Sequence, residues 1–299
     1  MGVPFAFCGV AAAWHGWCGF TLGILIVIAA PYTFLTTRWP VWNDMMIHRF
    51  TSSRAFAKCS MQQDPTHPID FEGESPVLLA YSPHGVFCAA FSGSHGVLHP
   101  LLFDKGVVFL LASFLYHMPL FRLFVVALFG NVRDASRGSM ESLMTERRHV
   151  ALLPGGLEEA SIVEPGRERV YVRRRKGFVK LALRYGYTIY PIYTFGESEA
   201  YRTFVPAWLP FALRWRINSW KLPVAAPWGR WWAPLMPLAG AELHTVVGRP
   251  IKCPRTDEKQ LRGGPIVDEY HRRYVAELLR VFDEQKAKFG REHARLEIY

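Results

Sequence analysis

The hydrophobic residues of this chain fall into short runs separated by amphipathic stretches. Five runs rich in apolar and β-branched residues, each bounded by turn-forming residues, predict buried strands. These runs are Val77–Tyr81, Val107–Leu110, Val150–Leu153, Thr188–Tyr193 and Leu243–Val247. Helical spacing of apolar side chains predicts helices at Met140–Arg147, Gly177–Tyr185 and Ile266–Phe289. Because strands alternate with helices, we predict an α/β fold with a mostly parallel central sheet flanked by helices.

The N-terminal end of the chain differs from the rest. Its first 37 residues contain no Lys, Arg, Asp or Glu, and tryptophans flank the apolar core Phe20–Ala30 on both sides. Tryptophan is enriched at bilayer interfaces because its ring is amphipathic. As a helix, residues 18–38 would span roughly 31 Å, close to the hydrocarbon thickness of a bilayer. We therefore predict a membrane-embedded segment at residues 1–42, either a helix or a re-entrant hairpin, followed by one domain at residues 43–299.

Composition and charge narrow the class of protein. Half of the 299 residues are hydrophobic and the mean hydropathy is +0.06. This apolar content is higher than that of a typical soluble domain and lower than that of a polytopic transporter. The formal net charge is +10. The chain lacks paired Cys/His zinc spacings and RNP-type aromatic runs, so we predict no nucleic-acid partner. The positive charge then favours a membrane surface or a phosphorylated ligand. The five cysteines form no C-x-x-C pair, which favours reduced thiols facing the cytosol.

Two further apolar segments remain open to alternative interpretations. Gly106–Gly130 is either a buried helix pair or the wall of a groove for an acyl chain. Trp208–Trp232 holds six of the ten tryptophans, interleaved with arginines and a lysine. That mixture favours a membrane interface, where cations meet lipid phosphates, over an ordinary mixture of core and surface residues.

The segment Ser82-Pro83-His84-Gly85 directly follows the strand predicted at residues 77–81. Ligands bind at the carboxyl ends of strands in open α/β sheets. Pro83 restricts Ser82 to an extended conformation, and Gly85 leaves room for a ligand to approach the imidazole. A histidine in this position can accept a proton near neutral pH, although a structural histidine in a turn would give the same pattern.

Two motifs downstream suit the binding of anions. Gly155 and Gly156 follow the strand predicted at 150–153, and their backbone N–H groups can hold a phosphate or an oxyanion. Glu158 and Glu159 come next and are candidates to orient the histidine. The run Arg173–Lys180 contains five cations just before a predicted helix, which suits a phosphate-rich ligand such as CoA.

These motifs together resemble the type 2 diacylglycerol acyltransferase family, which also contains monoacylglycerol and wax-alcohol acyltransferases. The most specific match is Arg175–Gly186 followed by Pro191–Glu197. Further segments match in the same order, namely Tyr81–Gly85 (His-Pro-His-Gly), Arg133-Asp134 (Ser-Arg-Asp), Gly155-Gly156 with Glu159 (Gly-Gly-x-x-Glu) and His244–Pro250 (Val-Val-Gly-x-Pro). Ser82 stands where the family usually has a histidine, which leaves His84 as the candidate base in that motif.

The resemblance implies a glycerolipid-acyltransferase-like fold and direct transfer of an acyl group from acyl-CoA to a lipid hydroxyl. In this scheme His84 is the general base, and Glu159 either holds the imidazole tautomer or binds the acceptor. The backbone of Gly85, Gly155 and Gly156 stabilises the oxyanion, and Arg175, Lys176 and Lys180 bind the CoA phosphates. Pro83, Gly177, Phe178, Gly196 and Glu197 match structural positions of the motifs. Acyl-CoA is a substrate, and no metal or other cofactor is implied.

The resemblance leaves the acceptor open. Diacylglycerol is the default, and a monoacylglycerol or a long-chain alcohol is the alternative. A lipid hydrolase is a remote alternative, because Ser92-Gly93-Ser94-His95-Gly96 comes close to a nucleophile elbow but lacks its first glycine. A non-catalytic lipid-droplet protein is another. The resemblance also implies an endoplasmic reticulum membrane location with the catalytic domain (residues 43–299) facing the cytosol, and lipid droplets as a second location. Homo-oligomerisation is left open.

Overall fold

The computed structural model describes residues 56–93, 95–118, 121–122, 130–164, 166–204, 213, 216–217, 226–234, 236–262 and 264–299. The membrane segment predicted at residues 1–42 lies outside these described residues. So do Ser94 and most of the segment between Trp208 and Trp228. In the part of the chain that the structure describes, no helix combines the length and hydrophobicity needed to cross a membrane.

An eight-stranded sheet forms the centre of the described chain. Its strands follow the order β1 (Lys58–Gln63), β10 (Glu242–Val247), β7 (Thr188–Phe195), β2 (Val77–Ser82), β5 (Val150–Leu152), β3 (Val108–Leu111) and β4 (Val132–Asp134), and β11 (Ile251–Lys252) also pairs with β7. Only β10 and β11 pair antiparallel to their neighbour β7; all other pairings in this sheet are parallel. The prediction of an α/β fold with a mostly parallel sheet is confirmed.

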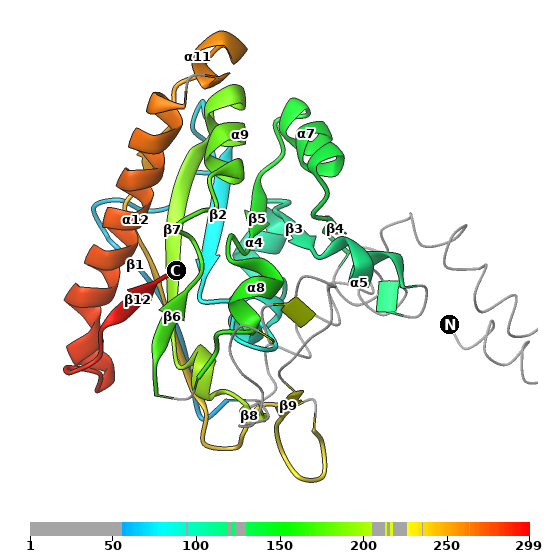
Figure 1. Ribbon diagram of the computed structural model, residues 1–299, viewed down its shortest axis with the longest axis vertical. Helices are drawn as coiled ribbons and strands as arrows, with labels where there is room; N and C mark the ends of the chain where they lie inside the picture. The colour runs from blue at the N-terminus through cyan, green and yellow to red at the C-terminus, as the bar shows by residue number, and fades with distance from the viewer. Residues whose placement is uncertain are drawn as a thin grey trace, which may run out of the picture.

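Strand β2 is buried on both faces of the sheet. Leu78 and Ala80 pack with Phe178 and Leu278, which belong to the helices α9 (Gly177–Tyr185) and α12 (Pro265–Gln285). The alternate residues of β2 pack on the other face, against α3 (Ala89–Ser92) and α4 (Pro100–Asp104). Burial on both faces explains why the central strands are continuous apolar runs in the sequence. Figure 1 shows α9 and α12 beside β7.

The parallel strands β2, β5 and β7 end at the same edge of the sheet. Figure 1 shows α8 (Gly156–Ala160), β8 (Arg202–Phe204) and β9 (Ala226–Trp228) toward this carboxyl edge, whereas α11 (Glu258–Arg262) lies at the opposite end. The remaining elements are α5 (Ser113–His117), α7 (Arg137–Thr145), β6 (Glu168–Val170), η1 (Glu197–Glu199), η2 (Lys286–Phe289) and β12 (Leu296–Ile298). The loops that carry the predicted chemistry therefore meet at one edge.

The predicted elements differ from the observed ones at their ends. All five predicted strands are present, and α9 has the predicted bounds. Helix α7 begins at Arg137, three residues before the prediction, because the Ser136 side chain accepts the N–H of Ser139 and caps the helix. Helix α12 ends at Gln285 and continues as the 3-10 helix η2. In the segment 106–130, for which a buried helix pair was one of two alternatives, the described part begins with strand β3 and continues with the short helix α5; the choice between the alternatives stays a prediction.

Candidate active site

His84 lies directly after β2, at the carboxyl edge of the sheet. The Ser82–Pro83 peptide bond is cis, and Gly85 adopts a left-handed conformation with φ of 61°. A side chain at Gly85 would meet the carboxyl group of Glu197 at 2.8 Å. Ser82 is buried, and its hydroxyl lies 3.5 Å from the Tyr274 hydroxyl in the core. The residue that replaces the family's first histidine therefore points away from His84.

The contacts of the imidazole indicate which nitrogen carries the proton. Nδ1 lies 2.9 Å from the carbonyl oxygen of Gly85, so Nδ1–H donates and Nε2 is left as the basic nitrogen. Burial lowers the pKa of His84 below its usual value of 6.5, so the ring is neutral at physiological pH. The tautomer is thus held by a backbone carbonyl, a partner that the sequence motifs did not indicate.

Cys88 is a neighbour of the imidazole that we did not predict. Its Sγ lies 3.3 Å from both ring nitrogens of His84. Its backbone is left-handed, with φ of 51°, which is uncommon for a residue other than glycine. Burial, together with the nearby carboxyl groups of Glu197 and Glu159, raises the pKa of the Cys88 thiol. The thiol therefore stays protonated and is a weak donor toward Nε2, which an incoming hydroxyl can displace.

Glu159 contacts the backbone of His84 and not its imidazole. One carboxyl oxygen accepts the N–H of His84, and the other accepts the N–H of Tyr171 at 2.7 Å. The side chain is 1% exposed. A side chain at Gly155 would lie 1.9 Å from the Glu159 carboxyl, which explains a glycine at this position. Glu159 therefore joins the end of β5 to the loop that carries His84, a different geometry from the tautomer-holding role implied by the resemblance.

Glu197 holds the other end of the same loop. Its carboxyl oxygens accept the N–H groups of Ala89, at 2.5 Å, and Ala90, at 2.9 Å. Gly196 makes the turn from β7 into η1 with φ of 91°, and a side chain there would collide with the carbonyl oxygen of Glu242 at 1.9 Å. Two buried carboxyl groups thus fix the segment from His84 to Ala90 at both ends.

The stability of this arrangement is expected to depend on pH. Burial raises the pKa of Glu197 from its usual 4.5 to about 7, although the hydrogen bonds from Ala90 and Ala89 oppose the shift. A folded-state pKa above the unfolded value contributes stability that is present below pH 4.5 and is lost as the pH rises through about 7. We expect the melting temperature of the wild type to decrease as the pH is raised from about 5 to about 8. The decrease should be smaller in Glu197→Gln. Thermal unfolding followed by tryptophan fluorescence measures this, and equal slopes would contradict the assignment.

The glycine turn after β5 offers one N–H group for an oxyanion. Gly156 has φ of 58°, and its N–H donates to the Leu153 carbonyl at 3.2 Å. The N–H of Gly155 has no hydrogen-bond partner among the described residues. In this geometry Gly155 is the better candidate donor of the two glycines in this turn.

A basic cavity of about 450 Å³ lies between the end of β5, α7 and the start of α9. Its wall includes Leu152, Leu153 and Gly177, and Phe178 packs against Tyr274 with ring centroids 5.0 Å apart. The cations that line it are Arg137, Arg174, Arg175, Lys176, Lys180 and Arg184, and none of its described lining residues is acidic.

The three cations that the resemblance assigns to CoA all have acidic partners. Arg175 pairs with Glu158, Lys176 lies 2.7 Å from Asp268, and Lys180 lies 3.7 Å from Glu258. These partners keep the cations in place without a ligand. An entering phosphate would exchange with the exposed carboxylates of Asp268 and Glu258 and with the half-buried carboxylate of Glu158. Water screens such pairs, so each contributes little.

The structure brings most of the predicted site residues together. His84, Gly85, Glu159, Gly155 and Glu197 are joined by direct contacts. The cationic run lies at the next strand end, and Glu158 beside Glu159 links it to this group through Arg175. Asp134, in the Arg-Asp motif, accepts from Ser113 and Ser136 and organises the loops after β3 and β4. In the described ranges no group of three His, Cys, Asp or Glu side chains could hold a metal ion.

Comparisons with known proteins agree with the motif order. Residues 46–299 match the sequence model of the family described as Diacylglycerol acyltransferase. The chain is 30% identical to Diacylglycerol O-acyltransferase 2 of Danio rerio, over 71% of this chain and 62% of that protein. It is 31% identical to 2-acylglycerol O-acyltransferase 3 of Homo sapiens, over 71% of this chain and 65% of that protein.

Among solved structures, the crystal structure of the 1-acyl-sn-glycerophosphate acyltransferase PlsC from Thermotoga maritima covers 92% of this chain and 93% of its own, with 14% identity and a TM-score of 0.40. That score is too low to support an inference. The aligned region spans less than two thirds of the length of the two relatives named above. The match of the family model over residues 46–299 is sufficient to establish that the chain belongs to the diacylglycerol acyltransferase family.

Proposed function

We propose that this protein transfers a fatty acyl group from acyl-CoA to the hydroxyl of diacylglycerol, giving triacylglycerol and free CoA. Family membership supports the class of reaction. The observation that carries the proposal is the neutral imidazole of His84, whose Nδ1–H donates to the Gly85 carbonyl and leaves Nε2 as the base. The basic cavity at the neighbouring strand end is suited to the phosphates of CoA.

In the proposed mechanism, Nε2 of His84 accepts the proton of the lipid hydroxyl while the hydroxyl oxygen attacks the thioester carbon. The tetrahedral intermediate carries an oxyanion, which the N–H of Gly155 stabilises. The intermediate collapses by breaking the bond between carbon and sulfur. The CoA thiolate then takes the proton from the imidazolium, which returns His84 to its neutral form. Glu159 and Glu197 hold the loop in place and take no proton from the substrate.

Monoacylglycerol is the second candidate acceptor, because a 2-acylglycerol O-acyltransferase is among the relatives at 31% identity. A long-chain alcohol is the third. The proposal also includes attachment to the endoplasmic reticulum membrane through residues 1–42, with the catalytic domain facing the cytosol, and location on lipid droplets. Expression with a fluorescent tag and fractionation of the membranes tests the location independently of the reaction.

The reaction is tested by incubating the purified full chain in detergent with acyl-CoA and each of the three hydroxyl lipids. We expect release of the CoA thiol together with the acylated product, and most product with diacylglycerol. Absence of transfer to all three lipids would reject the proposal. Labelling of Ser94 by a fluorophosphonate probe would instead favour the hydrolase alternative. Expression in cells that lack neutral-lipid synthesis shows which product accumulates.

The basic cavity gives a prediction about acyl-CoA. The double variant Arg174→Glu, Lys176→Glu reverses two charges of the cavity wall. We expect the KM for acyl-CoA to rise by about tenfold or more and kcat to change by less than about threefold, because the phosphates are far from the reacting carbon. Arg173→Glu is the matched control, since Arg173 lies outside the cavity wall and its guanidinium donates to the Ile298 carbonyl. An equal effect of Arg173→Glu would mean that overall charge, and not this cavity, sets the KM.

A further inference from the structure

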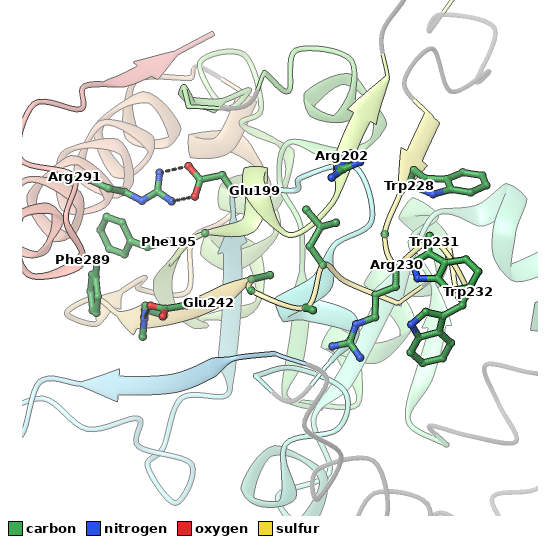
Figure 2. A pocket seen from close by; sticks show the side chains of 17 residues that line it. Phe195, Glu199, Arg202, Trp228, Arg230, Trp231, Trp232, Glu242, Phe289 and Arg291 are labelled. Atoms are coloured by element: carbon green, nitrogen blue, oxygen red, sulfur yellow. Dashed lines mark hydrogen bonds and ion pairs between the residues drawn. The ribbon is translucent and has the colours of Figure 1, made fainter.

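A second and larger cavity, of about 970 Å³, lies on the opposite side of His84 from the basic cavity. Its walls come from the end of β7, the start of β10, the segment from β9 to Trp232 and the region after η2. Figure 2 shows Phe195 and Phe289 on one side of it and Trp228, Trp231 and Trp232 on the other.

The sheet order fixes how the two cavities lie relative to His84. Strand β2 carries His84 at its end and lies between β7 and β5. The basic cavity adjoins the end of β5, and the larger cavity adjoins Phe195 and Gly196 at the end of β7. The next residue, Glu197, binds the loop that begins at His84. The two cavities therefore flank the base at the same edge of the sheet.

The wall of the larger cavity is unsuited to a second phosphate-rich ligand. Arg291 makes two hydrogen bonds to Glu199, of 2.7 and 3.0 Å, which Figure 2 draws as dashed lines. Arg291 also pairs with the buried Glu168, and Glu242 pairs with Lys58 at 3.0 Å. Among the described lining residues, three are cations (Arg202, Arg230 and Arg291) and two are acids (Glu199 and Glu242). The contrast with the basic cavity, whose wall has six cations and no acid among its described residues, is clear.

What remains is an aromatic wall with polar atoms at its rim. The side chains of Trp228, Trp231 and Trp232 are 52%, 85% and 60% exposed, which is unusual for tryptophan on a surface that contacts only water. Arg202 lies opposite Trp228 in the two-stranded antiparallel sheet of β8 and β9, and it also lines the cavity. Indole rings accept acyl chains, and an arginine donates to ester carbonyls. This chemistry suits a neutral lipid that carries ester groups.

We propose that this cavity binds the acyl acceptor, a neutral glyceride, so that acceptor and acyl-CoA reach His84 from opposite sides. The inference rests on the proposed function and assigns to it a second substrate site. Its lining carries both signs of charge, its exposed surface is aromatic, and it includes Gly196, the residue that precedes Glu197. Separate entry allows both substrates to be bound at the same time, as direct transfer requires.

Two glycines give a matched pair of variants that fill one cavity each. Gly240 lines the larger cavity and Gly177 lines the basic cavity. A Cβ added at either position meets no atom within 4 Å, and neither glycine has a positive φ. A leucine side chain at either position can therefore occupy part of the cavity without backbone strain. We expect Gly240→Leu to raise the KM for diacylglycerol by about tenfold and to leave the KM for acyl-CoA within about twofold, and Gly177→Leu to do the reverse.

A membrane-docking role of the tryptophans is the competing explanation. Phe204 is 69% exposed in the same two-stranded sheet but does not line the cavity, so Phe204→Ala is the control. We expect Trp228→Ala to raise the KM for diacylglycerol in detergent, where no bilayer is present, and Phe204→Ala to leave it within about twofold. If Trp228→Ala and Phe204→Ala weaken binding to phosphatidylcholine vesicles equally and neither changes that KM, the cavity is a docking surface and the proposal fails.

Photolabelling tests the acceptor site independently of acyl transfer. The probe is a diacylglycerol with a diazirine in one acyl chain, crosslinked to the full chain and mapped by mass spectrometry. We expect labelled peptides within residues 226–244 and a loss of label in Gly240→Leu. That result would support the site even if the wild type transferred no acyl group. Label elsewhere, unchanged in Gly240→Leu, would overturn the site even if the wild type were active.

Discussion

His84→Ala is expected to lower kcat for acyl transfer by about 10²–10⁴-fold, the usual contribution of a general base. The imidazole is neutral and half-buried, and its Nδ1–H donates to the Gly85 carbonyl, so Nε2 is the basic nitrogen of the site. With alanine at this position no other base takes its place. Cys88 has a pKa raised by burial, and Ser82 contacts Tyr274 in the core.

The measurement is the rate of CoA release with saturating acyl-CoA and diacylglycerol, using protein whose melting temperature matches that of the wild type. Binding of acyl-CoA should be retained in His84→Ala, because His84 is not among the residues that line the basic cavity. The wild type should lose activity only below the usual histidine pKa of 6.5, since burial lowers the pKa of His84. A variant that kept more than about a tenth of the wild-type kcat would remove His84 from the role of base.

The elements that could be predicted from the sequence are those whose own residues show the pattern of a buried strand or of a capped helix. Strands β2 and β7 are buried at every position, so each is a continuous apolar run. Helix α9 ends at Gly186, whose left-handed conformation (φ of 71°) is a usual helix stop. Strand β1 was missed because it is a polar edge strand, with its residues exposed or half-buried. Its place in the sheet depends on pairing with β10, which is far away in the sequence.

The sequence indicated which candidate site residues lie close together, but not which atoms they contact. Motif order indicated His84, Glu159 and Glu197 as candidates, but the direction of a carboxyl group cannot be predicted from the sequence. The bond from the His84 N–H to Glu159 exists because β2 and β5 are neighbours, which places two separate loops at one edge. The acidic partners of the cationic run are similarly distant, and Asp268 on α12 is 92 residues from Lys176. Cys88 was missed because a lone cysteine in an apolar run gives no local signal.

Variants of Glu159 separate a role in positioning His84 from a role in holding its tautomer. Glu159→Ala removes the carboxyl group that accepts the half-buried N–H groups of His84 and Tyr171. We expect the free energy of unfolding to fall by about 2–4 kcal/mol, because each unsatisfied donor costs about 1–3 kcal/mol. The loop is then no longer held at its His84 end, and misplacement of a catalytic group by about 1 Å can cost about 10²-fold in kcat.

Glu159→Gln and Gly155→Ala give the decisive comparison. The amide oxygen of Gln can accept one of the two N–H groups while its NH₂ faces the other, so we expect smaller losses of stability and kcat than in Glu159→Ala. Gly155→Ala places a Cβ 1.9 Å from the carboxyl oxygen and must displace it, so this variant should resemble Glu159→Ala although the carboxyl group is intact. If Glu159 only positions the backbone, all three variants lower kcat without shifting the acid limb of the pH profile, that is, the pH at which kcat falls on the acid side. The reason is that Gly85 still accepts Nδ1–H. A shift of that limb in Glu159→Gln would mean instead that the carboxyl group acts on the imidazole itself, as it does in a hydrolase triad.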